Sequence, residues 1–297
     1  MPLISIILCT FNGEAYLKAQ IDSILNQTYK SIELIVCDDK STDNTISILN
    51  AYAQKDSRIK VNSNLNNLGY IKNFEKGIAL ATGEYIALSD QDDVWALDKI
   101  EKLYNNIKDY DLIYCDSLFV DKNLKSLNKK MSSSKNMISS NNPLHFALDN
   151  CVSGHALLFK KQLCNTIFPF PKLIPHDWWI AFNATLNGGI TYFNEALVDY
   201  RIHDNNTLVL NKNRKSKENK IYKRQARVLE FYKKCPEHHY AKKILLNLEL
   251  LYKKPTAKNN FKKIALFLKH KEELFIIKKK KSLALIFYIL KLYNKIK

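Results

Sequence analysis

The chain is organised around one stretch, Tyr85-Ile86-Ala87-Leu88-Ser89-Asp90-Gln91-Asp92-Asp93, in which a short apolar run leads directly into three carboxylates. Four apolar or aromatic residues in succession predict a buried strand. Carboxylates at the end of a buried strand repel each other and lose hydration, so they need a counter-charge. Asp oxygens suit Mg²⁺ or Mn²⁺, which proteins commonly share with the phosphates of a substrate. The alternative is a solvated acidic turn that leads into a helix N-cap.

Strands and helices alternate on both sides of this stretch. Apolar runs predict the strands, and apolar residues at helical spacing predict the helices between them. The strands are predicted at 5–9, 32–37, 58–61, 85–88 and 112–115, and the helices at 17–25, 46–53, 71–78 and 97–107. This alternation predicts an α/β fold with a mostly parallel central sheet flanked by helices.

Polar side chains follow three of the predicted strands directly: Thr10 and Asn12, Asp38 and Asp39, and Asp90 and Asp92. In open α/β sheets, ligands bind outside the carboxyl ends of the strands. The three pairs therefore predict one nucleotide site at this edge. The sequence contains neither GxGxxG nor GxxxxGK[ST], so a metal or side chains must neutralise the phosphates.

Three segments, in this order and spacing, resemble family 2 glycosyltransferases across residues 3–205. They are Ser5-Ile6-Ile7-Leu8-Cys9-Thr10-Phe11-Asn12, the turn Asp38-Asp39-x-Ser41-x-Asp43, and Ala81-Thr82-Gly83-Glu84-Tyr85-Ile86 leading to the three carboxylates. The resemblance implies a GT-A fold and inverting transfer from a nucleotide-sugar with Mn²⁺ or Mg²⁺. It also implies that Asp38 or Asp39 contacts the base, Asp90 the ribose and Asp92 the metal, while Thr10 and Asn12 line the nucleotide pocket. Asp93 is left as a candidate cap of the following helix.

A second motif is His176-Asp177-Trp178-Trp179. An acceptor hydroxyl that attacks the sugar needs a general base within hydrogen-bond reach. A carboxylate beside two tryptophans is partly desolvated, which makes it more basic. The resemblance gives Asp177 this role, although His176 stands where many members carry an acidic residue, and Trp178 and Trp179 would stack on sugar rings. The alternative is Asp177 as the N-cap of a helix, with both tryptophans in the core.

A third motif is Tyr200-Arg201-Ile202-His203-Asp204-Asn205-Asn206. Arg201 is a candidate for binding the departing diphosphate, and His203 is a candidate metal ligand. The alternative is a surface ion pair with Asp199 or Asp204. This motif and the second one resemble rhamnosyltransferases of bacterial surface polysaccharide assembly. The QxxRW motif of processive synthases is missing, which favours the addition of a single sugar.

Other residues of the second half are candidates for the acceptor side. Gly154 permits close approach of its backbone to a sugar, and His155 either touches substrate or is structural. The polar segment 122–142 is expected to be a mobile acceptor-side flap or a disordered loop. Trp95 is expected to pack in the core, with a role as a wall of the donor pocket as the alternative.

The charge is unevenly distributed along the chain. The net charge is +17, and residues 211–297 alone hold 26 Lys and Arg against 6 Asp and Glu. We therefore predict a glycosyltransferase domain at 1–210, nucleotide-binding to about 115 and acceptor-binding from 116, and a basic helical extension at 211–297. Its helices are predicted at 216–234, 237–253 and 258–279, and the apolar run 282–290 suits an interfacial helix that docks on an anionic membrane. A helical lid packed on the core is the alternative.

The remaining composition favours a cytoplasmic protein at the inner face of the plasma membrane. The six cysteines are scattered without a CxxC, which indicates reduced thiols. No basic region of a signal peptide precedes the first strand, and no apolar run approaches the roughly 18 residues of a membrane span.

Together these features predict a metal-dependent, inverting enzyme. It would move one hexose or deoxyhexose from a dTDP- or UDP-sugar to a glycan or lipid-linked acceptor, with glucosyl or galactosyl transfer as the alternative to a rhamnose-like sugar. A nucleic-acid-binding protein that uses the basic region, and a catalytically silent nucleotide-sugar sensor, are the alternatives from other classes.

Overall fold

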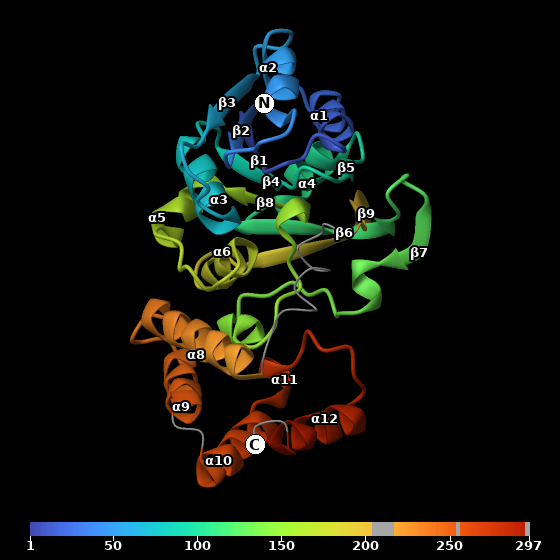
Figure 1. Ribbon diagram of the computed structural model, residues 1–297. Helices are drawn as coiled ribbons and strands as arrows, with labels where there is room; N and C mark the ends of the chain where they lie inside the picture. The colour runs from blue at the N-terminus through green and yellow to red at the C-terminus, as the bar shows by residue number, and fades with distance from the viewer. Residues whose placement is uncertain (204–216, 254–255, 295–297) are drawn as a thin grey trace.

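The structure is a computed structural model that describes residues 1–203, 217–253 and 256–294 (Figure 1). Asp204, Asn205 and Asn206 of the third motif and the predicted domain boundary at 210 lie outside the described residues. The strands are β1 Ile4–Thr10, β2 Ile32–Asp38, β3 Ile59–Ser63, β4 Tyr85–Ser89, β5 Val94–Trp95, β6 Leu112–Val120, β7 Ser126–Lys130, β8 Leu157–Lys160 and β9 Ile190–Arg201. The α-helices of the first two hundred residues are α1 Leu17–Leu25, α2 Thr45–Ala53, α3 Tyr70–Leu80, α4 Lys99–Ile107, α5 Cys164–Ile167 and α6 His176–Thr185.

The strands of the described residues form one sheet, in which their order is β3-β2-β1-β4-β8-β6-β9-β5, with β7 paired to β6. The first four strands pair in parallel, as the alternation of strands and helices predicted. From β8 onward the sheet is mixed, because β8 is antiparallel to β4 and β6 while β9 is parallel to β6. The predicted α/β fold is confirmed, and the carboxyl ends of β1, β2 and β4 meet at one edge.

Side chains of β1 alternate between the two faces of the sheet, which gives the core two layers. Ile4, Ile6 and Leu8 pack with residues of α1, α2 and α4. Ile7 packs on the opposite face with residues of α3 and α6. Helices therefore cover both faces of the sheet (Figure 1). All six cysteines are free thiols, and Trp95 is 2% exposed in the core, as predicted.

The segment 122–142 is more ordered than predicted. Residues of β7 turn back and pair antiparallel with β6, and a 3-10 helix, η1 (Met131–Ser133), follows. Asp116 holds this return, since its carboxylate accepts hydrogen bonds from the backbone N–H of Ser132 (3.1 Å) and from the Ser132 hydroxyl (2.6 Å). The alternative of a disordered loop was wrong, because long-range contacts that carry no periodic signal in the sequence order this segment. Its role as a mobile acceptor-side flap stays a prediction.

Helices form the C-terminal region, below the sheet in Figure 1. They are α8 Lys217–Lys234, α9 Ala241–Lys253, α10 Ala257–Lys269, α11 Lys271–Leu274 and α12 Ser282–Asn294. The single helix predicted at 258–279 was wrong, because His270 leaves the helical conformation and its ring contacts Glu273 at 2.8 Å. In the described residues, no helix is long and apolar enough to cross a membrane.

The candidate active site

The carboxylates at the end of β2 are buried and fully engaged by the protein itself. Asp39 accepts hydrogen bonds from the Asn64 side chain (2.8 Å) and from the backbone N–H groups of Leu68 (2.7 Å) and Gly69 (2.8 Å). Asp38 accepts hydrogen bonds from the hydroxyl of Thr10 at 2.8 Å and from the backbone N–H of Ser41 at 2.9 Å. These contacts fix the loops beside the predicted nucleotide pocket.

The Thr10 side chain is 2% exposed and is used for the contact with Asp38. Asn12 is exposed and has a positive φ of 50°, so its backbone turns sharply after β1. Its side-chain oxygen accepts a hydrogen bond from the backbone N–H of Thr42 at 2.8 Å. The structure thus joins the first two polar pairs, with Asn12 at the open edge of the loop.

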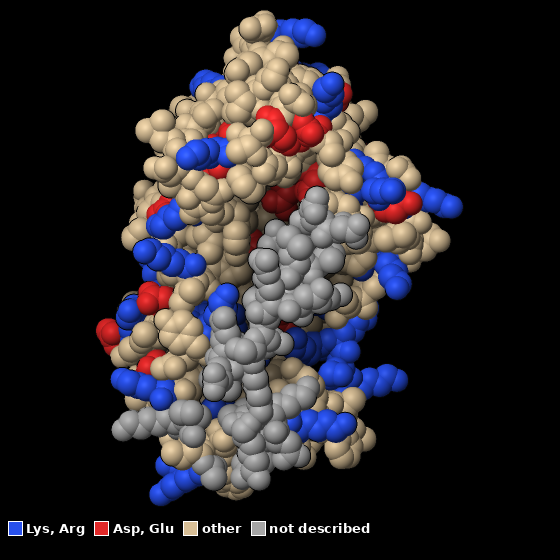
Figure 2. Space-filling model, in the orientation of Figure 1, with Lys and Arg blue, Asp and Glu red and all other residues tan. Residues whose placement is uncertain are grey.

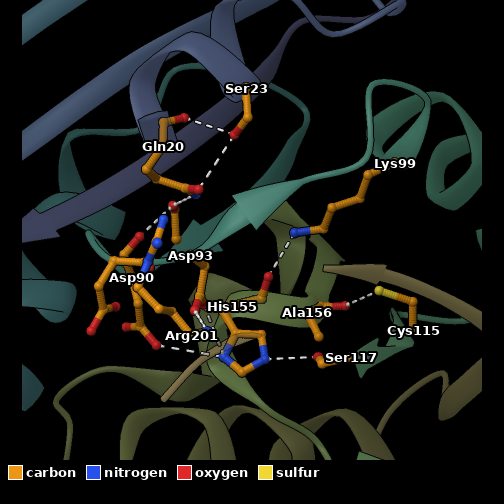
Figure 3. A network of polar contacts seen from close by, with 12 residues as sticks. Gln20, Ser23, Asp90, Asp93, Lys99, Cys115, Ser117, His155, Ala156 and Arg201 are labelled. Atoms are coloured by element: carbon orange, nitrogen blue, oxygen red, sulfur yellow. Dashed lines mark hydrogen bonds and ion pairs between the residues drawn. The ribbon is translucent and has the colours of Figure 1, made fainter. Parts of the chain in front are cut away.

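The carboxylates after β4 are engaged very differently. Asp90 and Asp93 both face the same ring nitrogen of the buried His155, at 3.5 and 3.6 Å from Nδ1 (Figure 3). The other ring nitrogen of His155 lies 2.9 Å from the Ser117 hydroxyl. One ligand atom from each of Asp90, Asp93 and His155 falls within a span of 4.8 Å, which is a possible metal-binding set.

Among the carboxylates after β4, Asp93 has the weakest compensation for its buried charge. Its side chain is 0% exposed; one oxygen accepts a hydrogen bond from the Arg201 backbone N–H at 3.1 Å, and the other has no hydrogen-bond partner in the described residues. Burial raises the pKa of the Asp93 carboxyl to about 8. The expectation that Asp93 caps a helix was wrong, since β5 follows it and α4 begins only at Lys99. A buried carboxylate oxygen that has no hydrogen bond, and only the His155 ring at 3.6 Å as a counter-charge, is a feature that a bound cation would relieve.

Asp92 points to another imidazole. Its Oδ2 lies 2.8 Å from His203 Nε2. Octahedral Mg²⁺ holds its ligands at about 2.1 Å, which places neighbouring ligand atoms about 3 Å apart. The pair predicted from the sequence therefore has a spacing that suits two ligands of one cation. Burial, followed by the charge of Asp90, raises the pKa of Asp92, so a positive charge here would favour its ionised form.

Arg201 contacts both Asp92 and Asp93 of the loop after β4. It is 4% exposed at the end of β9, and its guanidinium donates to the backbone carbonyls of Asp92 (2.8 Å) and Lys122 (2.6 Å). The guanidinium also lies over the ring of Tyr16 at 4.5 Å, and this ring contacts His203. Arg201 is thus a buried anchor of the acidic loop and not a surface residue. Asp204, one of the two carboxylates of the ion-pair alternative, lies outside the described residues.

Lys99 is a functional candidate that the sequence did not reveal. Its side chain is 0% exposed, lies 3.1 Å from the Trp95 ring centre and donates to the His155 carbonyl at 2.6 Å (Figure 3). Burial lowers the pKa of this amine to about 7. In the sequence, Lys99 resembles an ordinary surface lysine of an amphipathic helix. Only the fold shows that its amine is buried next to the acidic cluster.

Asp177 lies in the first turn of α6, on the other side of the site. It is not the N-cap, because that position is Pro175, and one carboxylate oxygen accepts a hydrogen bond from the backbone N–H of Trp178 at 2.6 Å. Burial raises the pKa of Asp177, and the charge of Asp90 raises it further. A carboxylate of raised pKa beside the acidic cluster suits proton abstraction.

Gly154 brings its backbone against this helix. A Cβ at Gly154 would lie 2.6 Å from His176 Nε2, so the position requires a residue without a side chain. The His176 ring stacks on Phe74, with ring centres 4.0 Å apart. His155 and Gly154 thus belong to the walls of the same site, although the sequence placed them on the acceptor side.

The two tryptophans of the second motif pack between α6 and α8. Trp179 is 4% exposed, donates to the Ile167 carbonyl at 2.6 Å and stacks on Phe231. Trp178 donates to the Phe146 carbonyl at 2.6 Å, and Arg227 covers its ring. The expectation that Trp179 stacks on a sugar was wrong, because its ring faces are buried in the core.

The acidic residues gather on the face that Figure 2 shows, in the upper half of the molecule, where they lie within a recess. Lys and Arg side chains are spread over the remaining surface of this view. A recess lined by carboxylates repels phosphate unless a cation neutralises it.

Sequence comparison places the chain in a family. Residues 5–168 match the family described as Glycosyl transferase family 2. The chain belongs to glycosyl transferase family 2. It is 32% identical over 206 residues to the Escherichia coli "UDP-Glc:alpha-D-GlcNAc-diphosphoundecaprenol beta-1,3-glucosyltransferase WfaP", covering 68% of this chain and 78% of that one. These comparisons do not support the predicted resemblance to rhamnosyltransferases.

Solved structures with the same fold include glycosyltransferases with bound donors. Staphylococcus aureus TarS in complex with UDP-GlcNAc is similar with a TM-score of 0.63 at 18% identity, covering 92% of this chain and 78% of that one. The mannosyltransferase PcManGT from Pyrobaculum calidifontis, in complex with GDP-Man and Mn²⁺, has a TM-score of 0.59 at 16% identity, covering 99% and 86%. These likenesses confirm the GT-A-like fold. The chain is a glycosyltransferase with a nucleotide-sugar donor.

Proposed function

We propose that this glycosyltransferase transfers one hexose, with inversion, from a UDP- or dTDP-sugar to a lipid-linked glycan precursor. One observation carries the proposal: three carboxylates follow β4, two of them around His155, and Asp177 in the first turn of α6 lies near enough for the charge of Asp90 to raise its pKa. The relative WfaP is named for glucosyl transfer to a diphosphoundecaprenol-linked sugar, which favours a glucose-type hexose over a rhamnose-like one.

Asp92 and His203 are the residues that would hold a divalent cation, and the buried, partly unpartnered carboxylate of Asp93 supports such a fit. When bound, Mn²⁺ or Mg²⁺ would neutralise charge on the donor diphosphate as a Lewis acid. Arg201 keeps the backbone of this loop in place through the Asp92 carbonyl. Asp38 and Asp39 would shape the pocket for the nucleotide base, and Asp90 would contact the ribose.

The acceptor side would work through Asp177. Its carboxylate takes the proton of an acceptor hydroxyl while the hydroxyl oxygen forms a bond to C1 of the sugar. The bond between C1 and the diphosphate oxygen breaks in the same step, and the nucleoside diphosphate leaves with the electron pair. Attack on the face opposite the leaving group inverts the configuration at C1.

The test is Asp177→Asn, an isosteric change that removes the base. General-base catalysis contributes typically 10²–10⁴-fold, so we expect kcat to fall about 10³-fold while the affinity for the donor stays unchanged. The control is Asp109→Asn, at an exposed position far from the recess. Full transfer activity of Asp177→Asn would refute the proposed mechanism.

We also propose that α12 docks on the anionic inner leaflet, where a lipid-linked acceptor would lie. Leu285 and Ile289 pack inward, whereas Leu283, Phe287 and Leu290 form an exposed apolar stripe, with exposures of 73%, 63% and 46%. Lysines 278–281 precede the helix. The helix therefore both packs on its neighbours and offers a membrane-binding face.

Sedimentation with phosphatidylglycerol vesicles tests the docking. We expect Leu283→Gln/Phe287→Gln to reduce the bound fraction, while Phe261→Gln, exposed by 70% on α10, leaves it unchanged. Equal sedimentation of both variants and the parent protein would argue against the α12 surface.

A further inference from the structure

A second group of charges lies outside the recess, between α6, α8, α9 and α10. Its centre is Arg227, whose guanidinium carbon lies 3.7 Å from the ring centre of Trp178. Arg227 Nε is buried and has no hydrogen-bond partner in the described residues. Within the described ranges, no carboxylate forms an ion pair with this arginine at 4 Å or less. An arginine so placed retains N–H donors for an acceptor that the described residues do not supply.

Two further cations accompany Arg227. Arg224 lies one turn earlier on α8 and interacts with the Tyr252 side chain on α9. Lys263 on α10 is 1% exposed, and its ammonium has only neutral partners in the described residues: the Tyr252 ring at 4.3 Å and the Asn260 oxygen at 3.5 Å. Arg224, Arg227 and Lys263 are called the cation cluster below.

The cluster is under-neutralised. Burial lowers the pKa of Lys263 to about 8 and that of Arg227 to about 10, and the charge of Arg224 adds to both effects. Asp149 is the carboxylate that acts on Arg227, but it already pairs with Lys135 and Lys278. Lys263 is buried, and Arg224 and Arg227 are half-buried. Cations that have lost part of their hydration without gaining a counter-ion are costly, so the arrangement suits an anion from outside the chain.

We propose that the cation cluster binds the diphosphate group of a lipid-linked acceptor. The inference rests on the proposed function and adds to it a site for the acceptor's anionic group. A planar guanidinium binds phosphate oxygens through paired N–H groups, and an arginine stacked on an aromatic ring is held in one orientation for this purpose.

The position of the cluster agrees with this assignment. The guanidinium of Arg227 lies over the ring of Trp178, and Trp178 directly follows Asp177 in the chain. In space, α8 lies beside α6 (Figure 1). The cluster is also separate from the acids after β4, where the donor diphosphate is expected. A diphosphate here would hold the first acceptor sugar near Asp177, and the C-terminal helices that carry the cluster also carry the exposed stripe of α12.

The kinetic test compares two acceptors with the same sugar: α-GlcNAc on a short-chain prenyl diphosphate and α-GlcNAc on a neutral alkyl group. For Arg227→Gln we expect the ratio of kcat/KM for the diphosphate acceptor over the neutral one to fall about tenfold to 100-fold. Lys262→Gln is the matched control, since it removes an exposed charge next to Lys263 and should leave the ratio unchanged. An unaltered ratio for Arg227→Gln would overturn the proposal.

A binding measurement keeps the proposal testable even if no transfer is observed. Calorimetry with farnesyl diphosphate, in the presence of saturating UDP and Mn²⁺ to fill the donor site, is expected to show binding that Arg227→Gln weakens at least tenfold. Arg227→Lys should retain part of the affinity, since lysine keeps the positive charge but lacks the paired N–H groups of the guanidinium. Binding that is equal in all variants, or binding only to phosphatidylglycerol vesicles, would refute an acceptor diphosphate site. If the proposed function fails, no sugar transfer is observed although farnesyl diphosphate still binds, so the two failures are distinguishable.

Discussion

Two strands of the same sheet, β2 and β4, end in acidic residues, and the protein treats them in opposite ways. Asp38 and Asp39 after β2 are surrounded by hydrogen-bond donors of the neighbouring loops. Asp93 after β4 is more deeply buried, yet one of its oxygens has no hydrogen-bond partner in the described residues. All of these residues are aspartates, so the supply of hydrogen-bond donors, and not the residue type, distinguishes the two groups. The hydrogen bonds of the first group stabilise the fold, whereas the proposed function assigns the second group to a cation that binds with the donor.

The largest effect is expected for Asp92→Ala. Loss of this candidate metal ligand should lower kcat/KM about 10³-fold, equivalent to about 4 kcal/mol, because charge on the diphosphate is no longer neutralised. The measurement is transfer from a UDP-sugar at saturating Mn²⁺, with Asp109→Ala as the exposed control. Activity within threefold of the parent would remove Asp92 from the site.

A second prediction concerns the satisfied group. Leu68 N–H donates to one oxygen of Asp39 and Gly69 N–H donates to the other. Asp39→Asn turns one of these oxygens into an NH2 group, so one of the two backbone N–H groups loses its acceptor and faces a donor. We expect the free energy of unfolding to fall by about 3 kcal/mol, since a buried donor loses its partner. Urea denaturation measures it. A change below 0.5 kcal/mol, the size expected for Asp109→Asn, would show that these bonds do not stabilise the loop.

The opposite sign is expected for Asp93→Asn. The amide retains an oxygen for the Arg201 backbone N–H and removes a buried group that burial disfavours in its charged form. Unfolding of the metal-free protein at neutral pH should therefore cost about 2 kcal/mol more than for the parent. A loss of stability equal to that of Asp39→Asn would contradict the distinction between the two groups.

The smallest effect is the response to the metal itself. At a free Mn²⁺ concentration ten times the dissociation constant, binding to the folded state should stabilise the protein by about 1.4 kcal/mol. Thermal unfolding with and without Mn²⁺ measures this gain, which Asp92→Ala/His203→Ala should lose and Asp39→Asn should keep. Identical gains in both variants would place the metal elsewhere.

Much of the fold and of the candidate site could be predicted from local patterns. Strand-end carboxylates such as Asp90 and Asp92 are recognisable because a strand leaves its next residues at the sheet edge. The partnership of Asp93 with His155 was not predictable, because these residues are 62 positions apart and meet only through the pairing of β4 with β8. The same holds for Lys99, whose burial depends on Trp95 and on the carbonyl of His155.

The sequence by itself determined the alternation of strands and helices, the polar strand ends, the family and the basic character of residues 211–297, because each is written in residues close together in the chain. The tertiary structure alone decided which acids are satisfied and which are not, that Trp179 packs in the core, and that Arg227 lies on Trp178 without a carboxylate partner. Burial and hydrogen-bond supply set these outcomes, and both depend on residues that are distant in sequence.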